Sequence, residues 1–258
     1  MIDTTPPPAI LCISGLDPSG GAGIQADITA IQRLQCHSLP IITSLTDQDT
    51  RNVKSCHPVN AEILQAQLAT IMDDCQPAAI KLGLIDHIDT VEVIATFLAA
   101  HPSIPVIADP VLGASGGYNF SGDDLVDAYC QRLLSLCTIL TPNIKELHRL
   151  VATDTDDENA AKQLAERGCH QILVTRGDDS DELVTNTLYT KGGLLKQWQW
   201  PRLPGRFHGS GCTMASAIAA YVGLGHSIEE ACFLGQQYTH QTLSSAYRIG
   251  KGQLVPNR

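Results

Sequence analysis

Short apolar runs alternate with stretches of helical spacing along most of this chain. The runs of strand length lie at 9–14, 38–45, 78–85, 106–111, 138–141 and 169–175. Between and after them, apolar residues three and four apart predict helices at 24–34, 61–75, 89–100, 121–136, 144–151, 155–168, 212–220 and 227–247. Continuous Val, Ile and Leu runs are typical of parallel strands buried on both faces. The alternation predicts βαβ units forming one mostly parallel sheet with helices on both faces, a three-layer α/β fold.

Local signals refine this prediction. Asn60 is a predicted helix cap, and three residue pairs fit capping boxes: Asp89 with Glu92, Thr155 with Glu158, and Ser227 with Glu230. The pattern at 183–204 predicts strand pieces or a hairpin. Its two Trp residues could belong either to a flap or to a packing surface. No repeat or linker marks a second domain, so we expect a single domain over 1–258 with a loose leader at 1–8.

Polar segments follow several of the predicted strands. They lie at 15–23, 46–50, 109–110, 141–143 and 175–177, and we expect them to be loops. In open parallel sheets, ligands bind beyond the carboxyl ends of the strands. These loops therefore predict one ligand-binding rim.

A glycine turn near the end of the chain carries the clearest chemistry. Gly209, Ser210 and Gly211 precede Cys212 and a run of small, helix-forming residues. Such a turn leaves first-turn N–H groups unpaired, and the helix dipole favours an anion there. The same end of a helix lowers the pKa of a thiol, which would make Cys212 a potential base. The alternative is a plain glycine turn with Cys212 as a small apolar filler.

Two carboxylates follow neighbouring predicted strands. Asp109 ends one strand, and Glu146 comes soon after the next. Together they could hold Mg²⁺, as phosphoryl-transfer sites do; the alternative is an N-capping Asp and an exposed helix Glu. His208 could pair with Cys212 in acid–base chemistry, although a surface or packing His is the commoner case.

Composition excludes several classes of function. The net charge of −10 argues against nucleic acid or an anionic membrane as the main partner. Nine scattered Cys residues without CxxC or zinc spacing indicate a reducing compartment, so we expect a cytoplasmic protein. No signal peptide or membrane-spanning run is visible. No P-loop motif occurs, and Gly21 with Gly23 matches a dinucleotide-binding turn only in part.

Several motifs together resemble the hydroxymethylpyrimidine/phosphomethylpyrimidine kinases of thiamin biosynthesis, which have the ribokinase-like fold. The resemblance covers about residues 10–220. Its motifs, in chain order, are Ser14–Asp27, Gln48 with Thr50–Val53, Lys81–Gly83, Asp109–Val111, Thr141–Asn143 with Glu146, and His208–Thr213.

The resemblance implies ATP- and Mg²⁺-dependent phosphorylation of 4-amino-5-hydroxymethyl-2-methylpyrimidine and then of its monophosphate. It assigns Gln48 to the pyrimidine edge, and Asp27 with the loop of Gly15, Asp17 and Gly21 to closing the substrate pocket. It places Mg²⁺ and phosphate at Asp109 and Glu146, and an anion hole at Gly209, Ser210, Gly211 and Cys212, with Cys212 as base. Nucleotide contacts fall on Asn143, Thr175 and Gly177. Related kinases are often dimers, so a homodimer is an expectation of the resemblance alone.

The chain departs from the family pattern at a few positions. Asp47 and Asp49 flank Gln48, where the family often has Ala and Asn, and could disfavour a phosphorylated substrate. A Lys that the family often carries is missing at Ala114, which puts the second phosphorylation in doubt. The same loop is similar to pyridoxal kinases of this fold. A pyridoxal kinase and a non-catalytic pyrimidine-binding protein therefore stay as alternatives.

Overall fold

The predicted apolar runs are strands of one sheet. The computed structural model describes residues 6–114, 116–177 and 181–258. Within these residues, the sheet has the order β3-β2-β1-β4-β5-β6-β7-β8-β9. Its strands are β1 (Ala9–Leu16), β2 (His37–Gln48), β3 (Val53–Pro58), β4 (Ala79–Leu82), β5 (Val106–Ala108), β6 (Ile139–Leu140), β7 (Gln171–Val174), β8 (Leu183–Thr190) and β9 (Gly193–Pro201).

The central strands, from β2 through β1, β4, β5 and β6 to β7, pair in parallel. Antiparallel pairing is confined to the sheet edges, where β3 joins β2 and the hairpin β8–β9 joins β7. The prediction of a mostly parallel α/β sheet is confirmed. Among the described residues, no helix is both long and apolar enough to span a bilayer.

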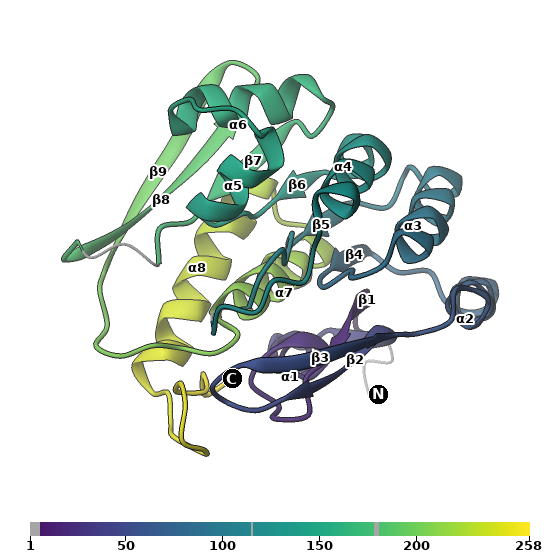
Figure 1. Ribbon diagram of the computed structural model, residues 1–258, viewed down its shortest axis with the longest axis horizontal. Coiled ribbons are helices and arrows are strands. Elements are labelled where there is room, and N and C mark those ends of the chain that lie inside the picture. Colours follow the sequence, from purple (N-terminus) through teal and green to yellow (C-terminus); the bar gives the residue numbers. More distant parts are fainter. Residues whose placement is uncertain (1–5, 115, 178–180) are drawn as a thin grey trace, which may run out of the picture.

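Helices cover both faces of the sheet (Figure 1). They are α1 (Gly23–Arg33), α2 (Ala61–Asp74), α3 (Ile88–Ala100), α4 (Asp123–Arg132), α5 (Ile144–Val151), α6 (Asp157–Glu166), α7 (Ser210–Gly223) and α8 (Ile228–Ser244), with a 3-10 turn at Leu134–Leu136. Alternate residues of β1 face opposite layers, because side chains alternate along a strand. Leu11 and Ile13 pack in the core under α2–α6, whereas Ile10 and Cys12 pack in the core under α1, α7 and α8.

The edge of the sheet holds the main error of the sequence prediction. Residues 46–50, expected to be a loop, include the last three residues of β2, and the hairpin partner β3 was not predicted. An edge hairpin with exposed polar side chains carries no apolar run, so its sequence is typical of a loop.

Helix caps agree with the prediction in part. Asn60 accepts from the N–H of Glu62, and Ser227 accepts from that of Glu230, so both predicted caps are confirmed. The boxes at Asp89 and Thr155 are wrong, because His87 caps α3 and Asp156 caps α6. Trp200 belongs to a packing surface, since its indole donates to Gln236 of α8 at 3.0 Å. Residues 1–5 of the predicted leader lie outside the described residues.

Candidate active site

Two helix starts meet at the carboxyl ends of the central strands. The loop after β1 runs into α1 at Gly23, and α7 begins at Ser210. Neither N-cap residue, Ala22 or Gly209, supplies a side-chain hydrogen bond to the first turn of its own helix. Gly209 has φ +78°, and a Cβ there would overlap the carbonyl oxygen of Gly21. The close approach brings two positively polarised helix ends together, which favours an anion.

Cys212 lies where the two helix starts meet. Its sulfur is buried, accepts from the N–H of Gly23 and donates to the carboxylate of Asp109. Burial raises the pKa of the thiol to about 12; Lys81 and the Gly23 N–H lower it, while Asp109 and Asp27 raise it. The predicted lowering of this pKa is therefore wrong. Burial beside two carboxylates outweighs the helix end, and the free protein carries a thiol.

Asp109 follows β5 and faces the start of α7. A Cβ on Gly211 would lie 3.7 and 3.8 Å from its two carboxylate oxygens. Burial raises the pKa of Asp109 to about 6; Lys81 and the Cys212 hydrogen bond lower it, whereas Asp27 raises it. A buried carboxylate open to the helix start has the donor chemistry that suits a hard cation.

A fully buried ion pair lies behind Cys212 and Asp109. The ammonium of Lys81, on β4, is 2.8 Å from Oδ1 of Asp27, on α1. Lys81 also donates to Ser14 at 3.0 Å, and Ser216 donates to Asp27 at 2.7 Å. Burial lowers the pKa of Lys81, but Asp27, Cys212 and Asp109 together raise it above its usual value.

This pair corrects one expected role. Asp27, predicted to close the substrate pocket, is fully buried and binds Lys81 and Ser216 instead. Sequence reasoning did not assign Lys81 to the site. Its signal was present, because a Lys inside the apolar strand Ala79–Leu82 has to be paired.

His208 joins the loop after β1 to the β2–β3 hairpin. Its Nε2 is 2.7 Å from Oδ2 of Asp17 and 3.0 Å from Nε2 of Gln48. A Cβ on Gly21 would overlap the imidazole ring. Three predicted substrate-binding residues, Asp17, Gly21 and Gln48, therefore gather around His208, for which the sequence left open pairing with Cys212 or a surface or packing role.

Asp17 organises the loop in which it lies. Its carboxylate accepts from the N–H and hydroxyl of Ser19, at 2.8 and 3.0 Å, and from the N–H of Ala22 at 2.8 Å. Burial raises the pKa of Asp17, but hydrogen bonds from His208 and Ser19 lower it by more than burial raises it. The net pKa of this carboxyl is therefore below its usual value. Gly15 packs against Leu84, where a Cβ would come within 2.8 Å of the Leu side chain.

The carboxylates beside Gln48 are both engaged elsewhere. Asp49 accepts from the side chain of Arg51 at 3.0 Å, and its pKa is lowered to about 2, chiefly by the N–H of Arg51. Asp47 binds Ser55 and His57 on β3. Neither negative charge is therefore left without a partner next to Gln48.

Glu146 has a structural task at the start of α5. It forms a capping box with Asn143, whose N–H donates to Oε2 at 3.0 Å. Its Oε1 accepts from the N–H of Leu112 at 3.3 Å. The alternative of an exposed helix Glu is wrong, because the side chain is buried. Within the described residues, no group of three or more His, Cys, Asp or Glu is arranged to hold a metal by itself.

The predicted nucleotide contacts follow β6 and β7. Asn143 and Thr175 pair as an isolated parallel bridge. Gly177 has open space where its Cβ would be, and its carbonyl accepts from Arg202 at 2.7 Å.

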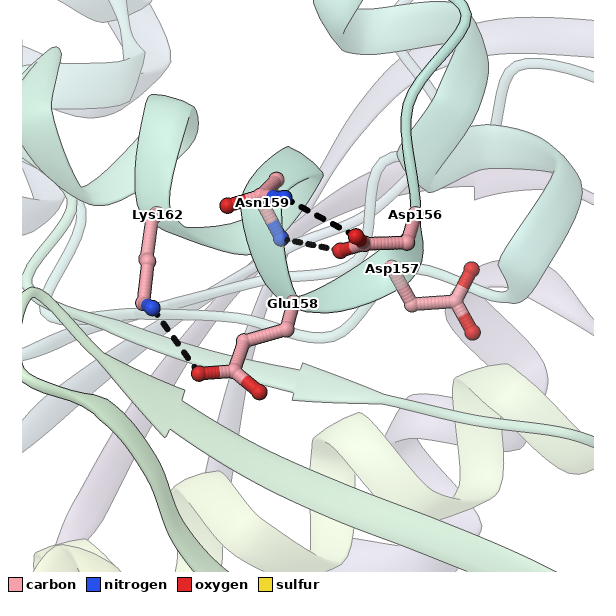
Figure 2. A pocket seen from close by; sticks show the side chains of 5 residues that line it. All are labelled: Asp156, Asp157, Glu158, Asn159 and Lys162. Carbon is pink, nitrogen blue, oxygen red and sulfur yellow. Dashed lines mark hydrogen bonds and ion pairs between the residues drawn. The ribbon is translucent and has the colours of Figure 1, made fainter.

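A neighbouring pocket lies at the start of α6 (Figure 2). Its charged residues are already used: Asp156 caps the helix, Glu158 pairs with Lys162 at 2.9 Å, and Asp157 pairs with His148 and Arg176. These paired charges suit a helix start better than a metal site.

Arg258 brings a cation to the paired helix starts. Its guanidinium donates to the hydroxyl of Thr213 at 2.8 Å and to the carbonyls of Gly21 and Gly209, at 2.6 and 3.3 Å. Burial lowers its pKa, while Cys212 and Asp27 raise it. One side chain thus ties the loop after β1 to the start of α7. The sequence pattern gave no sign of this contact.

A mostly parallel αβα sheet, with a glycine loop after its first strand and an uncapped helix start against it, defines a ribokinase-like fold. The model of the family described as phosphomethylpyrimidine kinase matches residues 17–257. The chain belongs to this family.

Named relatives agree with this assignment. The hydroxymethylpyrimidine/phosphomethylpyrimidine kinase of Bacillus subtilis is 31% identical over 247 residues, covering 94% of this chain and 91% of the relative. The chloroplastic thiamine biosynthetic bifunctional enzyme of Arabidopsis thaliana is 32% identical over 257 residues, which is 96% of this chain. The chain spans about half of that enzyme's length, 49%.

Solved structures show the same fold. An ADP complex of Bacillus subtilis pyridoxal kinase has a TM-score of 0.88 and 25% identity, covering 97% of each chain. The phosphomethylpyrimidine kinase of Clostridium difficile has a TM-score of 0.78 and 27% identity, covering 90% of this chain and 97% of its own. The predicted ribokinase-like fold is confirmed.

Proposed function

We propose that this protein transfers the γ-phosphate of ATP to the hydroxyl of 4-amino-5-hydroxymethyl-2-methylpyrimidine, and then phosphorylates the resulting monophosphate. One observation carries the proposal: the starts of α1 and α7, whose N-cap residues supply no side-chain hydrogen bond, meet around Cys212, beside Asp109. Phosphoryl transfer depends on positioning and on stabilising negative charge, and preformed N–H donors at a helix start supply both.

In this proposal the substrate oxygen forms a bond to the γ-phosphorus as the bond to the ADP oxygen breaks. N–H groups of Ser210, Gly211 and Cys212 would hold the charge that develops on the phosphoryl oxygens. Because the transition state is loose, the hydroxyl proton leaves late, when its oxygen has become acidic. A strong base is therefore not needed early in the reaction.

Cys212 is the proposed acceptor of that proton. Because its pKa is about 12 in the free protein, the sulfur can accept this proton only after its own S–H proton has left to solvent, which requires the charge around the sulfur to change when the substrates bind. Lys81 favours the thiolate, and Asp27 keeps this ammonium in place. We therefore assign Asp27 to positioning Lys81 rather than to contacting substrate.

The substrate pocket is proposed at Gly15, Asp17, Gly21 and Gln48. An amide can donate to and accept from a pyrimidine edge, and His208 fixes the Gln48 amide from behind. The partners of Asp47 and Asp49 support acceptance of a phosphorylated substrate as well.

ATP is proposed to bind along Asn143, Thr175 and Gly177, which follow the carboxyl ends of β6 and β7. The space beside Gly177 is open, since no atom lies where its Cβ would be. Asp109, with Glu146 acting through water, would hold Mg²⁺, which would neutralise phosphate charge when bound. The donors fit a hard cation that completes its shell with water and phosphate oxygens, since the described residues offer no three-carboxylate cage. Arg258 would hold the loop and the helix start in register around the phosphates.

A coupled ADP-release assay with ATP and Mg²⁺ tests the proposal, run in parallel on the hydroxymethylpyrimidine, its monophosphate and pyridoxal. Turnover on both pyrimidines is expected. Cys212→Ala should keep pyrimidine binding and lose turnover. No turnover on any of the three compounds would favour a binding protein and refute the kinase.

Pyridoxal is the second candidate substrate, because the pyridoxal kinase structure matches this chain with a TM-score of 0.88. Activity confined to pyridoxal would replace the pyrimidine as substrate. All nine cysteines are free thiols, which supports the proposed location in the cytoplasm. A homodimer without nucleic-acid or membrane partners stays part of the proposal, and light scattering of the purified protein would test the dimer.

A further inference from the structure

A basic pocket lies on the rim of the molecule, next to the β2–β3 hairpin. Its volume is about 470 Å³, and no residue of the paired helix starts lines it. Four segments contribute: the hairpin tip, the loop after β5, the segment before α7 and the segment after α8. The lining residues are Arg51, Gly116, Gly205, Arg206, Arg248, Lys251, Gly252, Gln253 and Leu254.

The charge of this pocket is opposite to that of the protein. The chain has a net charge of −10 and 17 Lys and Arg residues. Four of these cations, Arg51, Arg206, Arg248 and Lys251, line this one pocket, and among its lining residues none is acidic. This cluster of four cations in an acidic protein favours the binding of an anion.

Most of this positive charge is unmatched. Arg51 pairs with Asp49, at 3.0 Å. Arg248 donates to the carbonyl of Gly252, at 2.8 Å. In the described part of the chain, Arg206, Arg248 and Lys251 form no ion pair with a carboxylate. Three positive charges therefore face the pocket without a protein counter-charge.

The wall of the pocket is held in place by backbone contacts. Gly252 donates its N–H to the hydroxyl of Thr50 at 3.0 Å, and Gln253 donates to the Thr50 carbonyl at 2.9 Å. A Cβ on Gly252 would overlap the Thr50 backbone, so this contact admits no side chain. The segment after α8 is thus held against the hairpin tip. These contacts fix the position of the backbone that carries Arg248 and Lys251.

The same segment reaches the proposed substrate pocket. Leu254 donates to the carbonyl of Arg206 at 2.9 Å, and its own carbonyl accepts from the N–H of His208 at 2.8 Å. His208 contacts Gln48 two residues before Thr50. An anion in the basic pocket would therefore bridge the two segments that carry Gln48 and His208.

We propose that this basic pocket binds a soluble small molecule that bears a diphosphate group. A single phosphate monoester carries a charge of about −1.5 to −2, which is too small to neutralise three unmatched positive charges. A second phosphate group supplies the remaining negative charge. Arg side chains on separate segments suit bidentate contacts with phosphate oxygens. Binding would hold the hairpin tip against the segment after α8. The proposal does not depend on the kinase activity.

Inorganic pyrophosphate is the probe, and hydrogen exchange locates its site. The wild-type protein should gain protection at residues 49–52 and 248–254 when pyrophosphate is added. Binding at the paired helix starts would instead protect residues 209–213, so the two sites are distinguished by position. Isothermal titration gives the affinity for the same samples.

Two double variants with equal charge change separate the pocket from general electrostatics. Arg206→Gln with Lys251→Gln removes two pocket cations, and the affinity should fall about tenfold or more. Lys191→Gln with Lys196→Gln, on the β8–β9 hairpin at the opposite sheet edge, should leave it within twofold. All four side chains are exposed, so both variants should fold, which circular dichroism checks.

Three outcomes would overturn the proposal. The first is protection confined to residues 209–213, and the second is an equal loss of affinity in both double variants. The third is orthophosphate binding as tightly as pyrophosphate, which would refute the diphosphate assignment. Failure of the ADP-release assay alone would leave this site untouched.

Discussion

The buried pair of Lys81 and Asp27 gives the sharpest test of the described geometry. Both side chains are fully buried, and the ammonium lies 2.8 Å from the carboxylate. At that distance, an effective dielectric constant of about 20 gives an attraction of about 6 kcal/mol, most of which offsets desolvation. Removing one partner leaves the other charge buried, which costs about 3–5 kcal/mol of unfolding free energy.

Lys81→Met and Asp27→Asn should each lower the free energy of unfolding by about 3–5 kcal/mol, measured by urea unfolding at pH 7. The double variant should lose less than the sum of the two, because it leaves no isolated charge; Ser14 and Ser216 would keep partial hydrogen bonding. Activity is expected to fall in Lys81→Met, since Lys81 favours the Cys212 thiolate.

An exposed pair supplies the matched control. Lys162 and Glu158 on α6 are 2.9 Å apart but partly exposed to solvent, so Lys162→Met should lower the free energy of unfolding far less than either buried single variant. The reasoning would be refuted if the buried single variants cost under about 1 kcal/mol. An exactly additive double variant would refute it as well, because it would mean that the two charges do not stabilise each other.

Three further predictions follow from the same site. Because burial raises the pKa of Cys212 to about 12, iodoacetamide at pH 8 should label it far more slowly than a model thiol, and rapid labelling in peptide maps would contradict this. Asp17 has a lowered pKa, so its stabilisation is present above the unfolded value of 3.8 and is lost as pH falls through the folded value. The stability gap between wild type and Asp17→Asn, followed by urea unfolding from pH 7 to pH 3, should therefore shrink below about pH 4; a constant gap would argue against a charged Asp17. Arg258→Gln loses the charged clamp on Gly21 and Gly209, so turnover should fall about tenfold or more while circular dichroism stays unchanged; wild-type turnover would remove Arg258 from the proposal.

The sequence by itself determined the layers of the fold. Apolar runs marked each buried parallel strand. Because side chains alternate along a strand, successive residues such as Ile10 and Leu11 face opposite helix layers. Local caps such as Asn60 and Ser227 could also be predicted, because a cap and its N–H partner lie within three residues. The prediction that the loops carrying Gln48 and Asp109 lie at one rim followed from strand direction alone.

Only the tertiary structure decided how the charges of the site are matched. Asp27 meets Lys81 from 54 residues away, and Arg258 reaches Gly21 across 237 residues. The pKa of Cys212 was predicted with the wrong sign, because the helix start is a local feature while burial and the carboxylates of Asp109 and Asp27 are not. Short-range patterns record which face of an element is buried; desolvation and charge pairing depend on which distant side chains share that burial, and folding alone brings them together.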